Sequence, residues 1–149
     1  MSHRRPILLA EDNPREAELV RTALREAGVT NQLVVAHDGE VALDYLYRRG
    51  TYAGHRWPVP AVVFLDLNMP RVDGRAVLRE IRASAALRST PVVVLTSSRD
   101  DSDRHQSYCL GANAYVVKPL LQDDFVASLR RLGTFWGLLN EPPPAAVGA

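Results

Sequence analysis

The strongest structural signal in this sequence is a run of ten residues, Ala61-Val62-Val63-Phe64-Leu65-Asp66-Leu67-Asn68-Met69-Pro70. Five apolar residues lead without a polar break into the carboxylate of Asp66, and Asn68 and Pro70 then turn the chain. This pattern predicts a strand that is covered on both faces, as in a parallel sheet between helices. Because α/β sheets hold their ligands at the carboxyl ends of the strands, Asp66 is the first candidate for chemistry.

Length, charge and cysteine content limit the classes of protein to which the chain can belong. Its 149 residues suit a single domain, and its net charge of +1 favours neither nucleic acid nor a membrane surface as a partner. The single cysteine, Cys109, excludes an internal disulfide and fits a reducing compartment. The apolar run 7–10 is too short for a signal peptide or a membrane span. We therefore expect a cytoplasmic protein.

Apolar segments and helical patterns alternate five times along the chain. The expected strands are residues 7–10, 32–36, 61–66, 90–96 and 113–117, and the expected helices are residues 14–27, 39–49, 73–83, 100–110 and 122–139. The first helix has Asn13 as its N-cap, Pro14 at its first position and Glu16 at the third, which is typical of a capping box. Short connections in this order predict an α/β fold with a doubly wound parallel sheet.

Two segments lie outside this regular pattern. Residues 50–60 contain two glycines, two prolines, Tyr52 and Trp57. We expect a surface loop whose aromatic side chains partly pack down, with a partner site as the alternative. Residues 140–149 are rich in proline and cannot continue a helix. We therefore divide the chain into one domain, residues 1–139, and an extended or disordered tail.

The fourth expected helix, residues 100–110, is unusually polar. We expect Tyr108 and Leu110 to anchor it and the helix to be held less firmly than the others. Cys109 is expected to be a small buried side chain. Solvated surface positions are expected for the scattered histidines His37, His55 and His105.

Candidate site residues lie at the carboxyl ends of four of the five expected strands. These are Glu11 and Asp12 after the first strand, Asp66 at the end of the third, Thr96 at the end of the fourth and Lys118 after the fifth. In the strand order 2-1-3-4-5, one of the common orders of doubly wound sheets, the first and third strands are neighbours. Three carboxylates then converge and repel one another, which either raises a pKa or requires a cation. Lys118 offsets about one charge, and Mg²⁺ suits the remaining oxygen ligands.

A site of this composition suits phosphoryl transfer. A carboxylate such as that of Asp66 can attack a phosphoryl group and form an acyl phosphate. The reaction needs mainly positioning and charge stabilisation, which a metal ion, the ammonium of Lys118 and the hydroxyl of Thr96 provide. A lone aspartate at a strand end is usually a cap or a turn former, so the prediction depends on the whole group.

These residues resemble the receiver domain of bacterial two-component response regulators. The resemblance is carried in order by Glu11-Asp12, Asp66 with Met69-Pro70 and Asp73-Gly74, Thr96, and Tyr115-Val116-Val117-Lys118-Pro119. It covers about residues 6–137 and implies a flavodoxin-like fold of five βα units in strand order 2-1-3-4-5. It also implies a phosphoacceptor signalling protein, with self-catalysed phosphotransfer and autodephosphorylation, that is not an enzyme acting on a separate substrate.

The resemblance assigns the phosphoryl and metal sites. Asp66 is the phosphoacceptor that takes a phosphoryl group from a phosphohistidine of a sensor histidine kinase. Asp12 and Asp66 bind Mg²⁺ directly, Glu11 binds it through water, and the backbone carbonyl of Asn68 completes the protein ligands. Glu11 stands where the family more often has aspartate, which suits a contact through water.

The resemblance also assigns a switch. Lys118 pairs with the Asp66 carboxylate and then with a phosphoryl oxygen, and Thr96 moves to bond another oxygen. Tyr115 swings inward behind Thr96 and changes the surface formed by the fourth helix, the fifth strand and the fifth helix. The Lys118–Pro119 peptide bond is cis in the family and turns the lysine into the site.

Two other classes of function remain open. A hydrolase of the aspartyl-phosphate type needs a second carboxylate two residues after its nucleophile, where this chain has Asn68. A flavodoxin-like cofactor module needs a phosphate-binding Gly or Ser/Thr loop after the first strand, but Glu11-Asp12-Asn13-Pro14 is acidic there. In the receiver family, Asn68 and Ser98 occupy the variable positions that tune how fast phosphate is lost.

The C-terminal part of the sequence indicates how the signal is passed on. Since the chain stops soon after its last helix, we expect no output domain, so the signal passes by protein contact, a phosphorelay step or a phosphate sink. The loop 50–60 and the tail around residues 135–143 resemble stand-alone receivers that accompany phytochrome-type histidine kinases. In those relatives the last helix and tail help form a homodimer, and an apolar stripe ending in Trp136 and Leu139 fits such a contact.

Overall fold

A single parallel sheet forms the centre of the computed structural model, which describes residues 5–144. Its strands are β1 (Ile7–Ala10), β2 (Leu33–Ala36), β3 (Val62–Leu65), β4 (Val92–Thr96) and β5 (Ala114–Val117). They pair in the order β2-β1-β3-β4-β5, which confirms the expected order. The register pairs Ala10 of β1 with Leu65 of β3, so these neighbouring strands end at the same level. The residues that follow them therefore leave the sheet side by side.

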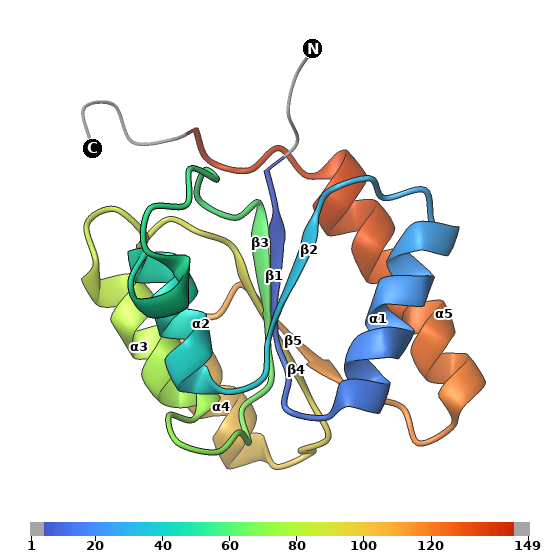
Figure 1. Cartoon of the computed structure of the whole chain (residues 1–149). Helices are drawn as coiled ribbons and strands as arrows, with labels where there is room; N and C mark the ends of the chain where they lie inside the picture. Colours follow the sequence, from blue (N-terminus) through green and yellow to red (C-terminus); the bar gives the residue numbers. More distant parts are fainter. Residues whose placement is uncertain (1–4, 145–149) are drawn as a thin grey trace.

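Helices cover both faces of the sheet, as expected for a doubly wound fold. They are α1 (Pro14–Glu26), α2 (Gly39–Tyr47), α3 (Gly74–Ala83), α4 (Asp101–Cys109) and α5 (Gln122–Gly133), and a π-helical segment (Thr134–Leu139) continues α5. Figure 1 shows α1 and α5 on one face, with α2, α3 and α4 on the other. Within residues 5–144, no helix combines the length and the apolar character that a membrane span requires.

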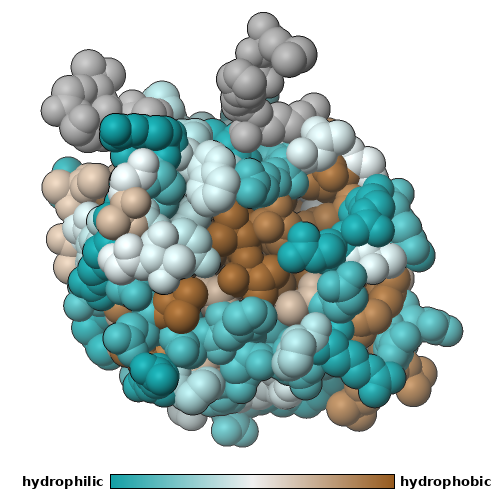
Figure 2. Space-filling view, in the orientation of Figure 1, coloured by the Kyte–Doolittle hydropathy of each residue, from teal (hydrophilic) through white to brown (hydrophobic). Residues whose placement is uncertain are grey.

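Each face of the sheet has its own apolar core. Along β3, Val63 and Leu65 join the core under α2 and α3, whereas Val62 and Phe64 join the core under α1 and α5. Both faces of this strand are buried, which explains its uninterrupted apolar sequence. The strand β2 forms an open edge, and apolar side chains gather near this edge at the centre of the face shown in Figure 2.

The second helix does not end at Gly50 as expected. It ends at Tyr47, where Arg48 adopts a left-handed conformation with φ of 57°, and a short 3₁₀ helix (Gly50–Tyr52) follows. Glycine is the usual residue for a left-handed cap because it has no Cβ. Here the Arg48 guanidinium donates a hydrogen bond to the Trp57 carbonyl at 2.8 Å, so a contact with the following loop accompanies the unusual backbone.

Two expectations for the fourth helix are wrong. Tyr108 is half exposed and Cys109 is exposed, so neither side chain anchors α4. Ser107 is the buried residue of this helix, and Leu110 just beyond its end packs partly against the core. A helix with so little apolar surface in contact with the sheet depends on polar contacts for its position.

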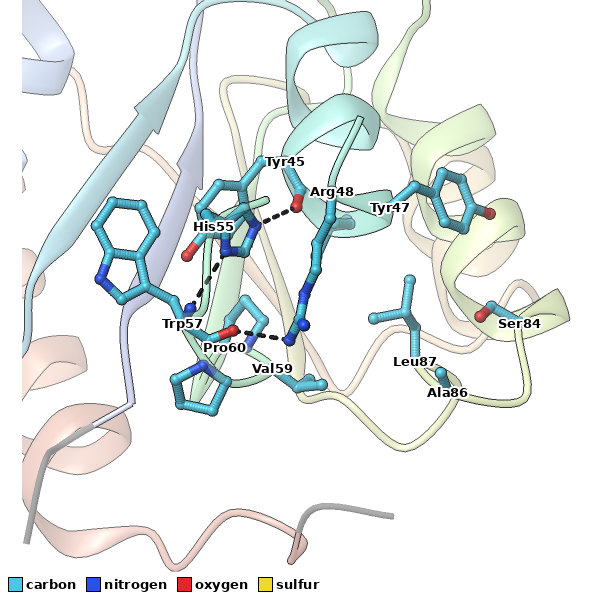
Figure 3. Close-up of a pocket in the computed structure, with 12 residues that line it drawn as sticks. Tyr45, Tyr47, Arg48, His55, Trp57, Val59, Pro60, Ser84, Ala86 and Leu87 are labelled. Atoms are coloured by element: carbon cyan, nitrogen blue, oxygen red, sulfur yellow. Dashed lines mark hydrogen bonds between the residues drawn. The ribbon is translucent and has the colours of Figure 1, made fainter. Parts of the chain in front are cut away.

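The loop 50–60 packs down through an aromatic cluster, as expected, but His55 belongs to that cluster and is not a solvated side chain. The His55 ring stacks on Tyr45 with ring centroids 4.7 Å apart, and Trp57 lies against both rings. His55 Nε2 lies 2.9 Å from the Tyr45 carbonyl, and His55 Nδ1 accepts a hydrogen bond from the Trp57 amide at 3.3 Å. Figure 3 shows these rings on the wall of a cavity of about 400 Å³ that also borders Arg48 and Leu87.

This cavity lies at the amino ends of the strands, away from Asp66, since Pro60 leads into β3 and Leu87 precedes β4. The predicted tail reaches the same end of the sheet. Its residues 140–144 follow the last helix without forming helix or strand, and Pro143 and Pro144 border the same small cavity as Pro60. The remainder of the tail, 145–149, lies outside the described residues.

Candidate functional site

Three carboxylates meet at the carboxyl ends of β1 and β3, the lower end of the sheet in Figure 1. Glu11, Asp12 and Asp66 each offer an oxygen, and these atoms lie within 4.8 Å of one another. Glu11 and Asp66 are buried, with exposed fractions of 2% and 8%, whereas Asp12 is exposed. The expected convergence of the three acids is confirmed, and the exposed Asp12 leaves the group accessible from solvent.

A close backbone approach shapes the turn that follows Asp66. The Asp66 amide donates to the Ala10 carbonyl at 3.1 Å, and the Gly74 amide donates to the Leu67 carbonyl at 2.9 Å. A Cβ atom on Gly74 would lie 2.1 Å from the Asp66 carbonyl oxygen, so only glycine fits there. Asp73 caps α3 by accepting a hydrogen bond from the Ala76 amide at 3.0 Å. The Asp73-Gly74 pair thus holds the start of α3 against the end of β3.

Lys118 is buried among acidic side chains. Its Nζ lies 2.7 Å from Glu11 Oε1, 3.0 Å from Glu16 Oε2 and 3.5 Å from Asp66 Oδ2. The contact with Asp66, which the resemblance predicts, is thus the longest of the three. The Lys118 amide donates to the Thr96 carbonyl at 2.7 Å, which fixes the lysine backbone at the end of β5.

The peptide bond between Lys118 and Pro119 is trans, so the cis bond that the resemblance implies is not found. The two isomers of a bond to proline differ by only about 1 kcal/mol, and residue types alone therefore do not decide between them. Lys118 reaches the acidic group from the trans form.

Glu16 is a site residue that the sequence patterns did not identify. Asn13 caps α1 as expected, since its side chain accepts hydrogen bonds from the amides of Arg15 and Glu16. The carboxylate of Glu16 instead binds Lys118, so it does not complete a capping box in the expected way. The spacing in the sequence could have indicated this residue. Glu16 lies in the first turn of a helix that starts three residues after Glu11, so its carboxylate begins near the acidic group.

Burial and charge shift the pKa values of the central pair. Burial raises the pKa of the Glu11 carboxyl to about 7, and the Asp66 charge adds to this, against the hydrogen bond and the charge of Lys118. Burial acts to lower the pKa of Lys118, but the hydrogen bond to Glu11 and the charges of Glu11 and Asp66 raise it to about 12. Lys118 is therefore a cation at neutral pH, and burial makes the charged form of Glu11 less favourable than it is in water.

Thr96, Ser98 and Tyr115 form a second group of connected residues beside the acids. Thr96 is fully buried at the end of β4, and its Oγ1 accepts a hydrogen bond from the Ser98 amide at 3.2 Å. The half-buried Tyr115 donates its hydroxyl to the Ser98 carbonyl at 3.1 Å. Ser98 Oγ donates to Asp103 of α4 at 2.6 Å, and Asp103 pairs with Arg75 of α3 at 2.5 Å. Hydrogen bonds thus connect the end of β4 with α4 and α3.

The family to which the chain belongs follows from comparison with known proteins. Residues 7–130 match the response regulator receiver domain. The chain is a member of this family. It is 39% identical over 140 residues to the probable methanogenesis regulatory protein FilR2 of Methanothrix harundinacea. The aligned residues cover 93% of this chain and 88% of FilR2. It is 36% identical over 130 residues to the response regulator Rcp1 of Synechocystis, with 87% of each chain covered.

Solved structures of similar receivers have the same fold. The Mn²⁺-bound form of Rcp1 superposes with a TM-score of 0.88 at 34% identity, covering 94% of this chain and 99% of Rcp1. The phosphorylated cyanobacterial phytochrome response regulator RcpA superposes with a TM-score of 0.88 at 34% identity, and the match covers 96% of this chain and 100% of RcpA. The bacteriophytochrome response regulator AtBRR is 51% identical, with a TM-score of 0.75 and coverage of 94% and 100%. The chain therefore resembles receivers that are named for phytochrome signalling.

Proposed function

We propose that this receiver accepts a phosphoryl group on Asp66 from a sensor histidine kinase and passes the signal on by protein contact. The observation that carries the proposal is the position of the Asp66 carboxylate, which lies at the end of β3 within reach of Glu11, Asp12 and Lys118. Proteins of this family are phosphoacceptors in signalling. The similar protein RcpA has been crystallised in a phosphorylated form.

The proposed transfer is a displacement at phosphorus. A carboxylate oxygen of Asp66 attacks the phosphorus of a phosphohistidine, a P–O bond forms, the P–N bond breaks, and the imidazole nitrogen leaves with the electron pair. Lys118 faces the carboxylate and stabilises the negative charge on the phosphoryl oxygens. Thr96 supplies a hydroxyl beside them. Water later hydrolyses the acyl phosphate and returns the free carboxylate, so the chain catalyses its own phosphorylation and dephosphorylation, and Asn68 and Ser98 tune the rate of loss.

The residues of the acidic group fit a hard divalent cation. Three carboxylate oxygens lie close enough to share one ion, and Lys118 is the cation that already contacts two of the three acids. We propose that Asp12 and Asp66 bind Mg²⁺ directly, that Glu11 binds through water and that the backbone carbonyl of Asn68 adds a ligand. The ion would supply charge neutralisation for the phosphoryl oxygens. The crystallised Mn²⁺ form of Rcp1 supports a metal site in this family.

Thr96 and Tyr115 are proposed to carry the signal away from Asp66. If Thr96 turns its hydroxyl toward a phosphoryl oxygen, its present hydrogen bond from the Ser98 amide is lost. The Ser98 carbonyl holds the Tyr115 hydroxyl, so a shift of Ser98 frees Tyr115 to move inward. The surface of α4, β5 and α5 then changes.

We propose a phytochrome-type histidine kinase as the phosphodonor. The similarity to AtBRR and RcpA supports this choice, and a phosphorelay step or a phosphate sink is the alternative output. Leu120 and Leu121 directly follow the Lys118-Pro119 motif and are 92% and 68% exposed, which suits a protein contact beside the site. Apolar side chains project where the connection from β5 to α5 lies, at the lower right of Figure 2.

A homodimer through α4, β5, α5 and the C-terminal segment is also proposed. Tyr108, Phe135 and Leu139 are large apolar or aromatic side chains that remain 50%, 48% and 67% exposed. A second copy would cover them. The molar mass measured by light scattering, with and without a phosphoryl mimic, tests this assembly, and a monomer in both states at every concentration would remove it.

The experiment that tests the proposed function is labelling with acetyl phosphate and Mg²⁺. The wild-type chain is expected to gain one labile phosphoryl group, seen as a single mass increment that disappears with time. Asp66→Asn removes the nucleophile and should abolish labelling. Asp101→Asn, an exposed carboxylate on α4, is a control that should be labelled as fast as the wild type. Labelling of Asp66→Asn at the wild-type level would show that Asp66 is not the phosphoacceptor.

A further inference from the structure

Lys118 has a carboxylate partner that does not belong to the proposed metal site. The Glu16 carboxylate binds Lys118 Nζ at 3.0 Å, closer than Asp66 at 3.5 Å. Within residues 5–144, the acids that lie close enough to share an ion are Glu11, Asp12 and Asp66, and Glu16 is outside that group. Its contact with Lys118 therefore has a different role from that of the other acids.

The position of the ammonium reflects a competition among three carboxylates. An ammonium has three N–H donors, and Glu11 and Glu16 take two of them at 2.7 Å and 3.0 Å. The third donor faces Asp66 at the limit of a hydrogen bond. Because each carboxylate attracts the same cation, the attraction from the α1 side holds the ammonium back from Asp66.

Glu16 is anchored well enough to exert this attraction. It lies in the first turn of α1, which is held by the Asn13 cap. Its side chain is 29% exposed and that of Lys118 is 6% exposed, so solvent screens their attraction only in part. The positive end of the helix dipole also favours a carboxylate at this position.

We propose that Glu16 is a positioning residue that holds the Lys118 ammonium on the α1 side and so leaves Asp66 available to a divalent cation. The inference rests on the proposed function and adds to it a residue that controls access to the phosphoacceptor. Without Glu16, the ammonium moves toward Glu11 and Asp66, where it competes with the divalent cation for the same oxygens.

A double-mutant cycle on Mg²⁺ affinity tests this role. Calorimetric titration with Mg²⁺ alone is carried out on the wild type, Glu16→Gln, Lys118→Met and the double variant. In the wild-type background Glu16→Gln is expected to raise the Mg²⁺ dissociation constant about five-fold, a size typical of coupled neighbouring groups. In the Lys118→Met background, Glu16→Gln is expected to change the Mg²⁺ dissociation constant by less than about two-fold, because no ammonium remains that could move toward Asp66.

Two results would overturn the proposal. An equal loss of affinity in both backgrounds means that Glu16 acts through its charge alone. No loss in the wild-type background means that it does not position Lys118. Glu18→Gln removes an exposed carboxylate from the same helix and should leave the dissociation constant unchanged. Circular dichroism identifies any variant that has lost its fold, and Glu16→Asp, a shorter acid, should recover part of the affinity.

The two proposals fail separately. If the wild-type chain takes no phosphoryl group from acetyl phosphate, the proposed function is removed, while the cycle on Mg²⁺ affinity still reports on Glu16. If labelling at Asp66 succeeds and the cycle shows no coupling between Glu16 and Lys118, the receiver function stands and the positioning role is removed.

Discussion

The buried ammonium of Lys118 lies 2.7 Å from the carboxylate of Glu11, which is also buried. Its distance to the carboxylate of Asp66, the expected phosphoacceptor, is longer, at 3.5 Å. The pair joins the end of β1 to the end of β5 across the width of the site. Buried ion pairs add little net stability, but removing one partner leaves the other charge without compensation. The site is therefore sensitive to the loss of Lys118.

Lys118→Met is expected to lower the free energy of unfolding by about 3 kcal/mol in the presence of a chelator, because Glu11 and Asp66 then lie together without a cation. Saturating Mg²⁺ should restore part of this loss by binding the folded state. Urea unfolding with EDTA and with Mg²⁺ measures both effects. The double variant Glu11→Gln/Lys118→Met is the control and should be more stable in EDTA than Lys118→Met. Equal stability of the two variants would contradict the explanation.

Arg75→Ala is expected to loosen α4. Arg75 of α3 holds Asp103 at 2.5 Å and Gln106 at 3.0 Å, and Ser107 is the buried residue of α4. Loss of these bonds should raise the hydrogen exchange rates of the α4 amides by about ten-fold, since local opening depends on few contacts. Arg79→Ala, an exposed arginine on the same helix, is the control that should leave these rates unchanged. Unchanged exchange in Arg75→Ala would mean that other contacts hold α4.

Tyr45→Phe is expected to stabilise the protein. The Tyr45 hydroxyl is buried and has no hydrogen-bond partner among the described residues, so its removal should raise the free energy of unfolding by about 1 kcal/mol. Burial raises the pKa of Tyr45 to about 12, with the Tyr52 charge adding to the shift. Tyr47→Phe, which removes an exposed hydroxyl bound to Glu80, is the control and should not stabilise the protein.

The same tyrosine predicts a pH dependence. Unfolded tyrosine loses its proton near pH 10, so between pH 10 and 12 the folded state binds more protons than the unfolded state. The stability that comes from the folded state's preference for protonated Tyr45 is thus fully present below pH 10 and is lost as the pH rises toward 12. Urea unfolding at pH 8 and pH 11 should show a smaller loss for Tyr45→Phe than for the wild type. An identical loss would show that Tyr45 does not titrate as described.

The location of the site was predictable because short sequence patterns, each an apolar strand that ends at an acidic residue, specify it. The uninterrupted apolar run before Asp66 predicts a strand buried on both faces, and β3 is such a strand. Glu11 follows another short strand, and the strand order places the two carboxylates together. Each step depends on the periodicity of side chains along a strand and on the short connections between elements, which neighbouring residues in the chain specify.

Several details were not predictable because they depend on contacts between distant residues. Arg48 takes the left-handed position that glycine usually occupies, and its side chain binds the Trp57 carbonyl in the following loop. His55 looks like a surface histidine in the sequence but stacks on Tyr45. Cys109 is exposed although its residue type is usually buried. A propensity describes the average environment of a residue type, and the packing of the chain decides the particular one.

The residue pattern was enough to predict the fold class and to place the three acids and Lys118 at one end of the sheet, and the family resemblance added the strand order. How the Lys118 ammonium is shared among the acids depends on the three-dimensional packing, which places Glu11 and Glu16 nearer to it than Asp66. Glu16 and Lys118 are 102 positions apart, and no local pattern relates them. Their contact depends on how α1 packs beside the end of β5, which side chains throughout both cores determine together.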